Sequence, residues 1–99
     1  MMELHICDRK GNRLRAFALG DRSEVIIGRD ESCDVQIRNN HVSREHCSIE
    51  SEGDELVLRD LGSTSGTFVN GQKVNLVRLQ DGIEVSVGPA VLKFFETGI

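Results

Sequence analysis

Two stretches of this sequence contain no acidic residue, although the chain as a whole is acidic. They cover residues 35–44 and 61–80, and all sixteen Asp and Glu residues lie outside them. Their cationic and imidazole side chains, set among many hydroxyl and amide groups, are Arg38, His41, Arg44, Lys73 and Arg78. A carboxylate within a Debye length of about 8–10 Å repels a phosphate, so the pattern favours an anion-binding face. Chance clustering of charge is the alternative that the pattern leaves open.

The overall composition limits the classes of function that remain. The chain has 99 residues, a mass of 11.0 kDa and a formal net charge of −4, which fits one domain over residues 1–99 and suits one module of a longer protein. This charge gives no general basic surface for nucleic acid or anionic lipid. Apolar runs such as residues 25–27 and 90–92 are far shorter than the roughly 18 residues of a membrane span. We therefore expect a cytoplasmic protein without nucleic-acid or membrane partners, since the start of the chain also lacks a secretory signal pattern.

The cysteines do not indicate a disulfide framework or a metal site. Cys7, Cys33 and Cys47 are odd in number and form no C-x-x-C pair, so we expect buried free thiols. Ligation by His41, His46 and Cys47 would lack the paired spacing of tetrahedral sites. The sequence therefore predicts no metal and no cofactor.

Alternation with period two recurs along the chain and predicts strands with one buried face. The segments with this pattern are residues 3–7, 14–19, 25–27, 35–38, 47–50, 56–58, 68–69, 83–87 and 91–95. Asn70-Gly71 between short apolar runs predicts a two-residue hairpin, because both central positions of a type I′ turn need positive φ. Turn signals at intervals of about 8–12 residues are typical of an all-β sandwich or barrel.

Two patterns resemble enzyme motifs, but each lacks a residue or motif that the enzyme requires. Ser43 precedes His46 by three residues, but no G-x-S-x-G elbow accompanies the pair. Gly66 and Gly71 have the spacing of a nucleotide-binding loop, but Gln72 follows where that loop requires lysine. We therefore expect no catalytic residues and no enzymatic activity.

Three motif segments taken together resemble the forkhead-associated (FHA) family. They are Gly28-Arg29, the Ser-Arg-Glu-His run at residues 43–46, and the Gly-Ser-Thr-Ser-Gly-Thr-Phe-Val-Asn-Gly run at residues 62–71. Each segment alone is weak, but their order and combination across the chain are specific. The resemblance implies a sandwich of two antiparallel twisted sheets, with loops at one end that bind phosphothreonine peptides.

The resemblance also implies which residues contact the phosphopeptide. Arg29 would supply a forked, charge-assisted contact to phosphate, where the alternative is a surface ion pair with Asp30 or Asp34. Ser43 and Thr64 match positions that reach the phosphate. The next residues along the chain complete the predicted contacts: Arg44 would add charge or a backbone N–H, His41 would read the peptide beyond the phosphate, and Ser65 would meet the peptide backbone.

Ser65 is also the departure from the family pattern, which commonly has asparagine there. A hydroxyl is shorter than an amide, so we expect lower peptide affinity or a bridging water. Structural support of the site is expected from five residues: Gly28, His46, Gly66, Asn70 and Gly71. The expected partner is a phosphothreonine-containing protein, either the substrate of a Ser/Thr kinase or a longer form of this chain. The alternative is an assembly domain that uses the same sandwich without phosphate.

Overall fold

The computed structural model describes residues 1–20 and 22–98 of the chain. These residues form eleven short strands joined by turns and loops, and no helix. Asp21 and Ile99 of the predicted domain lie outside these residues. The strands are β1 (Met2–Cys7), β2 (Arg13–Ala18), β3 (Glu24–Gly28), β4 (Val35–Gln36), β5 (Cys47–Glu52), β6 (Glu55–Asp60), β7 (Thr67–Val69), β8 (Gln72–Lys73), β9 (Leu76–Arg78), β10 (Glu84–Val87) and β11 (Ala90–Glu96). Within these residues no helix is long and apolar enough to cross a bilayer.

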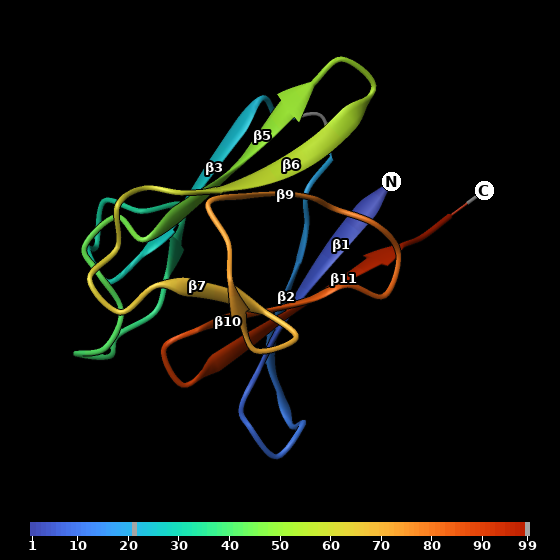
Figure 1. Ribbon diagram of the computed structural model, residues 1–99. Coiled ribbons are helices and arrows are strands. Elements are labelled where there is room, and N and C mark those ends of the chain that lie inside the picture. The colour runs from blue at the N-terminus through green and yellow to red at the C-terminus, as the bar shows by residue number, and fades with distance from the viewer. Residues whose placement is uncertain (21, 99) are drawn as a thin grey trace.

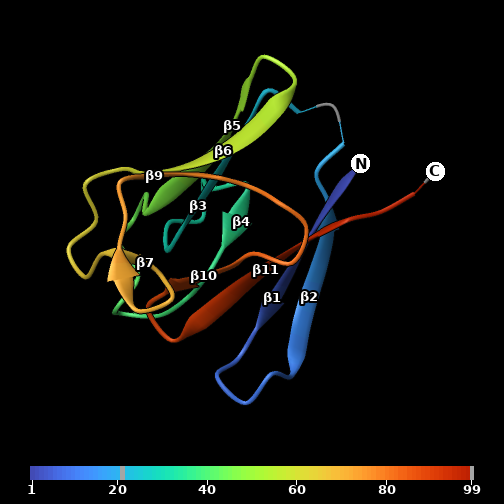
Figure 2. The same ribbon diagram turned by 45° about the vertical axis from the view of Figure 1, so that its right-hand side comes forward.

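The strands form two sheets that pack face to face. One sheet has the order β2-β1-β11-β10-β7-β8 and the other β4-β3-β5-β6-β9. Figure 1 shows the β3–β5–β6 layer above the layer that contains β1, β10 and β11, and Figure 2 shows the same two layers after a 45° turn about the vertical axis. The predicted all-β sandwich is confirmed.

One pair of strands departs from the antiparallel expectation. β3 and β4 are parallel, with Ile27 opposite Val35, whereas the other strand pairs of the described chain are antiparallel. Ile37 continues the contact by donating its N–H to the Gly28 carbonyl at 2.8 Å. The loop that follows β4 therefore begins beside the end of β3.

The core lies between the sheets and contains the apolar residues that the alternation places on one face. Leu4, Ile27, Leu58, Leu92 and Phe94 are fully buried there. Burying a side chain of this kind stabilises the fold by about 1.5–3 kcal/mol. These contacts hold the two sheets rigidly, so the loops at their ends start from fixed positions.

β2 is a strand, as predicted, but the expectation that one of its faces is buried is wrong. Every residue of β2 is exposed except Phe17, which is half-buried, and Leu14 is 62% exposed. β2 pairs with β1 alone and forms the edge of its sheet. Alternation along a sequence does not reveal whether a second layer covers the strand.

The predicted turn at Asn70-Gly71 is present between β7 and β8. The two residues have φ values of 52° and 78°, and Val69 lies opposite Gln72 across the turn. Positive φ at both positions is the geometry that asparagine and glycine tolerate. The turn closes a short ribbon at the edge of the six-stranded sheet.

The three cysteines are free, but they are not all buried as expected. Cys7 and Cys47 are buried, whereas Cys33 is half-buried. The Cys33 thiol donates to the Arg44 carbonyl over 3.1 Å. Burial raises the pKa of both Cys33 and Cys47 above the ordinary thiol value. Cys33 lies on the loop after β3, which has no covering layer at that point.

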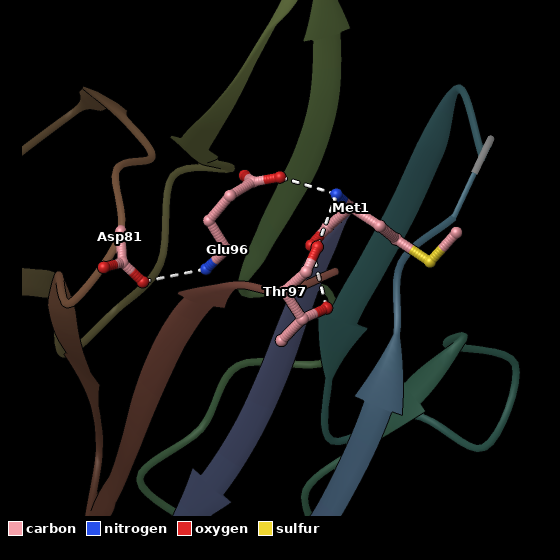
Figure 3. A network of polar contacts seen from close by, with 4 residues as sticks. All are labelled: Met1, Asp81, Glu96 and Thr97. Carbon is pink, nitrogen blue, oxygen red and sulfur yellow. Dashed lines mark hydrogen bonds and ion pairs between the residues drawn. The ribbon is translucent and has the colours of Figure 1, made fainter. Parts of the chain in front are cut away.

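The two ends of the chain meet because β1 and β11 are antiparallel neighbours, with Met2 opposite Glu96. Figure 3 shows the contacts that join them. The Met1 amino group lies 2.6 Å from Glu96 Oε1, and the Thr97 hydroxyl donates to the Met1 carbonyl at 3.1 Å. Asp81 accepts the Glu96 N–H at 2.9 Å. In Figures 1 and 2 this end lies opposite the loops β4–β5 and β6–β7.

Candidate functional site

Three segments that are distant in sequence converge at one end of the sandwich. They are the end of β3, the loop from β4 to β5 and the loop from β6 to β7, and the two loops lie together on the left of Figures 1 and 2. A hollow of about 340 Å³ lies among them, lined by Arg29, Asn40, His41, Val42, Ser43, Arg44, Thr64 and Ser65. We call it the rim hollow. Its lining includes two arginines and no acidic residue.

Gly28 allows the end of β3 to contact the β4–β5 loop directly. A Cβ on Gly28 would lie 2.1 Å from the Arg44 carbonyl oxygen, so no side chain fits there. The next two residues bond across the contact: the Arg29 N–H donates to the Ser43 carbonyl at 2.9 Å and the Asp30 N–H to the Arg44 carbonyl at 3.1 Å. The glycine thus brings Arg29 beside Ser43 and Arg44.

The Arg29 side chain is fixed by the loop and leaves most of its donors available. Its Nε donates to the Val42 carbonyl at 3.0 Å. No carboxylate among residues 1–20 and 22–98 forms an ion pair with Arg29, and Asp34 pairs instead with Arg22 at 3.6 Å. The ion pair considered for Arg29 with Asp30 or Asp34 is therefore not formed. Its two terminal amino groups can meet a bound anion at the rim hollow.

A hydrogen bond between Ser43 and Thr64 joins the two loops. The Thr64 N–H donates to Ser43 Oγ at 3.0 Å. Because the serine oxygen acts as acceptor here, its own O–H remains to donate to a ligand. Thr64 and Arg44 are exposed and Ser43 is half-buried. The structure therefore brings Arg29, Ser43, Arg44 and Thr64 together.

His46 lies beneath this contact and is fully buried. Its Nδ1 accepts the Ser43 N–H at 3.0 Å, so its proton is on Nε2, which donates to the Gly66 carbonyl at 2.9 Å. Both ring nitrogens are therefore occupied and can neither act as a base nor ligate a metal. No group of three metal-ligating side chains occurs among the residues that the structure describes. His46 positions one residue of each loop.

Asp60 organises the β6–β7 loop, and the sequence analysis gave it no role. Its carboxylate accepts the N–H groups of Gly62 and Ser63, each at 3.0 Å, and the hydroxyls of Ser63 and Thr67 at 2.5 and 2.7 Å. Ser63 Oγ in turn accepts the Gly66 N–H at 3.1 Å. Partial burial acts to raise the Asp60 pKa, but these hydrogen bonds outweigh it and the pKa is lowered. The Asp-x-x-Ser spacing at residues 60–63 was the signal that could have revealed this network.

Ser65 joins the two loops at their outer edge. Its hydroxyl donates to the His41 carbonyl at 2.5 Å. The peptide backbone was its expected partner, but its proton is already donated within the protein, so the oxygen can only accept from a ligand. Ser65 therefore acts first as a link across the rim hollow.

His41 is exposed at the border between the rim hollow and a second hollow of about 620 Å³. The second hollow is lined by Arg9, His41, Ser65, Phe68, Gly71, Ser86, Gly88, Pro89, Ala90 and Val91. Gly71 lines only the second hollow, and Asn70 lines neither. The Asn70-Gly71 turn is therefore near the rim hollow without forming part of it. Asn40 and Val42 line the rim hollow and were not predicted.

Gly66 completes the β6–β7 loop with a φ of 91°, in the region that favours glycine. A Cβ there would lie 3.0 Å from the Phe68 ring. Gly66 is buried, and both its N–H and its carbonyl are bonded within the site. The backbone conformation at this residue thus directs Thr64 and Ser65 toward the β4–β5 loop.

The sequence of this chain matches a known domain family and a curated relative. Residues 25–88 match the model of the FHA domain. Over 86 residues the chain is 33% identical to the glycogen accumulation regulator GarA of Mycolicibacterium smegmatis, covering 87% of this chain and 54% of that protein. The chain thus spans about half the length of this relative.

Two solved structures show the same likeness along nearly the whole chain. The FhaA FHA domain, complexed with the intracellular domain of Rv3910, has a TM-score of 0.82 at 31% identity and covers 95% of this chain and 99% of that one. A structure solved in an analysis of phosphothreonine-dependent FHA domain interactions has a TM-score of 0.81 at 28% identity and covers 99% of this chain and 98% of that one. The match therefore includes both sheets and the loops between them.

Proposed function

This chain belongs to the FHA domain family of non-catalytic, phosphothreonine-dependent binding modules, and from that premise we propose that the rim hollow holds the phosphate of a phosphothreonine peptide. The observation that carries the proposal is the position of Arg29. Its guanidinium is held by the Val42 carbonyl beside the Ser43 hydroxyl and has no described carboxylate partner. A cation held in this way near further donors fits a phosphate dianion.

The chemistry of a phosphate group matches the donors of the rim hollow. A phosphorylated side chain has a charge of about −1.5 to −2 at pH 7 and three acceptor oxygens. Arg29 offers its terminal amino groups, Ser43 offers its O–H, and Arg44 adds a second guanidinium. Each charge-assisted hydrogen bond contributes roughly 1.5–3 kcal/mol, and together they offset an association cost of several kcal/mol. We therefore expect modest affinity.

The proposal is tested by titrating the domain with three matched peptides that contain phosphothreonine, phosphoserine or unmodified threonine at one position. We expect measurable binding of the phosphothreonine peptide, weaker binding of the phosphoserine peptide and no measurable binding of the third. Equal affinity for all three would refute phosphate recognition. A partner retained equally well from dephosphorylated lysate would support an assembly domain instead.

We also propose a class of partner and a cellular compartment for this domain. The partner is a phosphorylated protein, either the substrate of a Ser/Thr kinase or a longer form of this chain, because the chain spans only 54% of the GarA relative. The domain over residues 1–99 would then be one module of such a protein. We propose a cytoplasmic location, because the three free thiols suit a reducing compartment.

A further inference from the structure

The basic residues of this acidic chain divide into two groups. Four form ion pairs with carboxylates: Arg22, Arg59, Arg78 and Lys93. Among the described residues the other eight have no carboxylate partner: Arg9, Lys10, Arg13, Arg15, Arg29, Arg38, Arg44 and Lys73. Arg29 and Arg44 line the rim hollow. Five of the others lie on or beside the β1–β2 hairpin, and we call them the hairpin surface: Arg9, Lys10, Arg13, Arg15 and Arg38.

The tip of this hairpin is a well-ordered turn that presents its cations outward. Asp8 is the only acidic residue between positions 8 and 18. Its carboxylate accepts the backbone N–H groups of Lys10 and Asn12, each at 2.9 Å, and the Asn12 side-chain amide at 3.0 Å. Arg9 and Lys10 remain exposed. The one negative charge is thus directed into the turn, while the positive charges face solvent.

The base of the hairpin is joined to the opposite sheet through Arg15. Its guanidinium donates to the Gln36 carbonyl and lies 5.7 Å from the centre of the Phe17 ring. The hollow beside it, of about 290 Å³, is lined by Ile6, Cys7, Asp8, Leu14, Arg15, Ile37, Arg38, Asn39, Pro89 and Ala90. Arg15 is therefore positioned by contacts with both sheets.

The hairpin surface is continuous with the rim hollow. The hollow beside Arg15 shares Pro89 and Ala90 with the second hollow, and the second hollow shares His41 and Ser65 with the rim hollow. In Figures 1 and 2 the β1–β2 turn projects downward from the body, near the turn between β10 and β11. A single extended chain can follow this track from the rim hollow to the hairpin.

We propose that the hairpin surface is a second docking site, which binds an acidic, extended segment of the same partner whose phosphothreonine occupies the rim hollow. The proposal rests on the proposed function and adds the chemistry of the partner outside the phosphate. Complementary charge favours this ligand, because five cations lie on this surface with the single carboxylate of Asp8, and none of them forms an ion pair among the described residues. The longest dimension of the molecule is 37 Å, so about 11 extended residues at ~3.3 Å each suffice to reach the hairpin.

Other occupants fit the surface less well. A second copy that paired its β2 edge with this one would bring Arg13 and Arg15 close to their own counterparts, and like charges at an edge oppose such pairing. A nucleic acid has no peptide backbone, so it could use the cations of this surface but not the free strand edge of β2. β2 also offers an exposed Leu14 and a free strand edge, with backbone groups that an extended peptide can pair with.

The test compares three phosphothreonine peptides and two triple variants of the domain. The short peptide has neutral residues around the phosphothreonine, and the long peptides add twelve Asp- and Glu-rich residues before or after it. The hairpin variant is Arg9→Gln with Lys10→Gln and Arg13→Gln. Its control, Arg59→Gln with Arg78→Gln and Lys93→Gln, changes the net charge equally but removes cations that are already paired.

We expect one of the acidic extensions to tighten binding to the unmodified domain about tenfold, with a strong dependence on salt. The hairpin variant should lose this gain and keep its affinity for the short peptide, while the control variant keeps both. No gain from either extension, or an equal gain in both variants, would overturn the inference without contradicting the phosphate site. Failure of the short peptide to bind would instead refute the proposed function.

A twelve-nucleotide single-stranded DNA tests the alternative ligand. If it bound the domain as tightly as the better of the two acidic peptides, the hairpin surface would be assigned to nucleic acid instead.

Discussion

The two ends of this sandwich treat charge in opposite ways. At the end where the termini meet, charges pair within the protein: the Met1 amino group contacts Glu96, and Asp81 accepts the Glu96 N–H. At the loop end, hydroxyls and backbone groups bond to one another while Arg29 and Arg44 have no described carboxylate partner. The terminal end thus pairs its charges within the protein, whereas the loop end keeps two arginines that can pair with a ligand.

At the loop end, the groups that fix the loops are different from the groups that carry unpaired positive charge. Neutral contacts fix the loops at the loop end, such as the bond from Thr64 to Ser43 and the two bonds of His46. The cations are therefore not needed to hold the loops together. Substitutions at the loop end can test this separation when each is compared with a matched control elsewhere in the domain.

The largest effect is expected for Gly28→Ala. The new Cβ would meet the backbone carbonyl of Arg44 at 2.1 Å, so β3 and the β4–β5 loop must separate. We expect the free energy of unfolding to fall by about 3 kcal/mol and phosphothreonine-peptide binding to be lost. Chemical denaturation and peptide titration measure the two effects.

Gly53→Ala is the matched control, because Gly53 has a φ of +65° but open space around its Cβ position. The strained backbone there should cost about 1 kcal/mol and leave peptide binding unchanged. If Gly28→Ala were as mild as this control, the close approach would not position the site.

A smaller, pH-dependent effect is expected for Asp60→Asn. The Asp60 carboxylate accepts four hydrogen bonds, and at pH 7 their disruption should lower the free energy of unfolding by about 2 kcal/mol. The pKa of Asp60 is lowered in the folded protein, so its contribution is complete above the ordinary value of 3.8 and disappears as the pH falls through the folded value. The difference between the two proteins should therefore shrink when unfolding is measured at pH 3.

Asp81→Asn is the counterpart at the terminal end, where the carboxylate accepts one backbone N–H. Its expected effect is below about 0.5 kcal/mol, as for an exposed surface substitution. Two results would show that the Asp60 network does not hold the loop. One is a loss of unfolding free energy in Asp81→Asn as large as that in Asp60→Asn. The other is a difference in unfolding free energy between Asp60→Asn and the unmodified domain that does not change with pH.

The smallest effect is expected for Ser65→Ala, which removes one hydroxyl-to-carbonyl bond across the rim hollow. The unfolding free energy should fall by about 1 kcal/mol and peptide affinity by about threefold, since the two loops are less tightly linked. Thr97→Val removes a similar bond, from Thr97 Oγ1 to the Met1 carbonyl at 3.1 Å. It should change stability slightly and affinity not at all. Equal loss of affinity in both variants would remove Ser65 from the site.

Much of the fold could be predicted because its signals are local. Alternating apolar residues such as Leu4, Ile27 and Leu92 point to the core, and Asn70-Gly71 identifies a turn by its φ requirements. Burial of β2 could not be predicted, because an edge strand and a covered strand can share one pattern. The strand β9 was not predicted, because its Leu76-Val77-Arg78 sequence shows no alternation of apolar and polar residues.

The candidate site could be predicted only in part, because its geometry depends on contacts between distant segments. Motif resemblance identified Arg29, Ser43 and Thr64, and the structure brings them together. It did not show that Ser65 bonds to the His41 carbonyl, since that contact joins positions 24 apart in the sequence. The role of Asp60 was missed for a different reason: its partners are local, but a short polar run has many possible turn geometries.

The most direct test of the account is a calorimetric titration of one phosphothreonine peptide into the unmodified domain, Arg29→Ala and Arg59→Ala. Arg29→Ala should weaken binding about a hundredfold through the loss of two charge-assisted bonds, with nearly the same unfolding midpoint. Arg59→Ala, which removes a cation paired with Glu50, should bind normally. Retained binding in Arg29→Ala, together with a large loss of stability, would contradict the account and make this arginine structural.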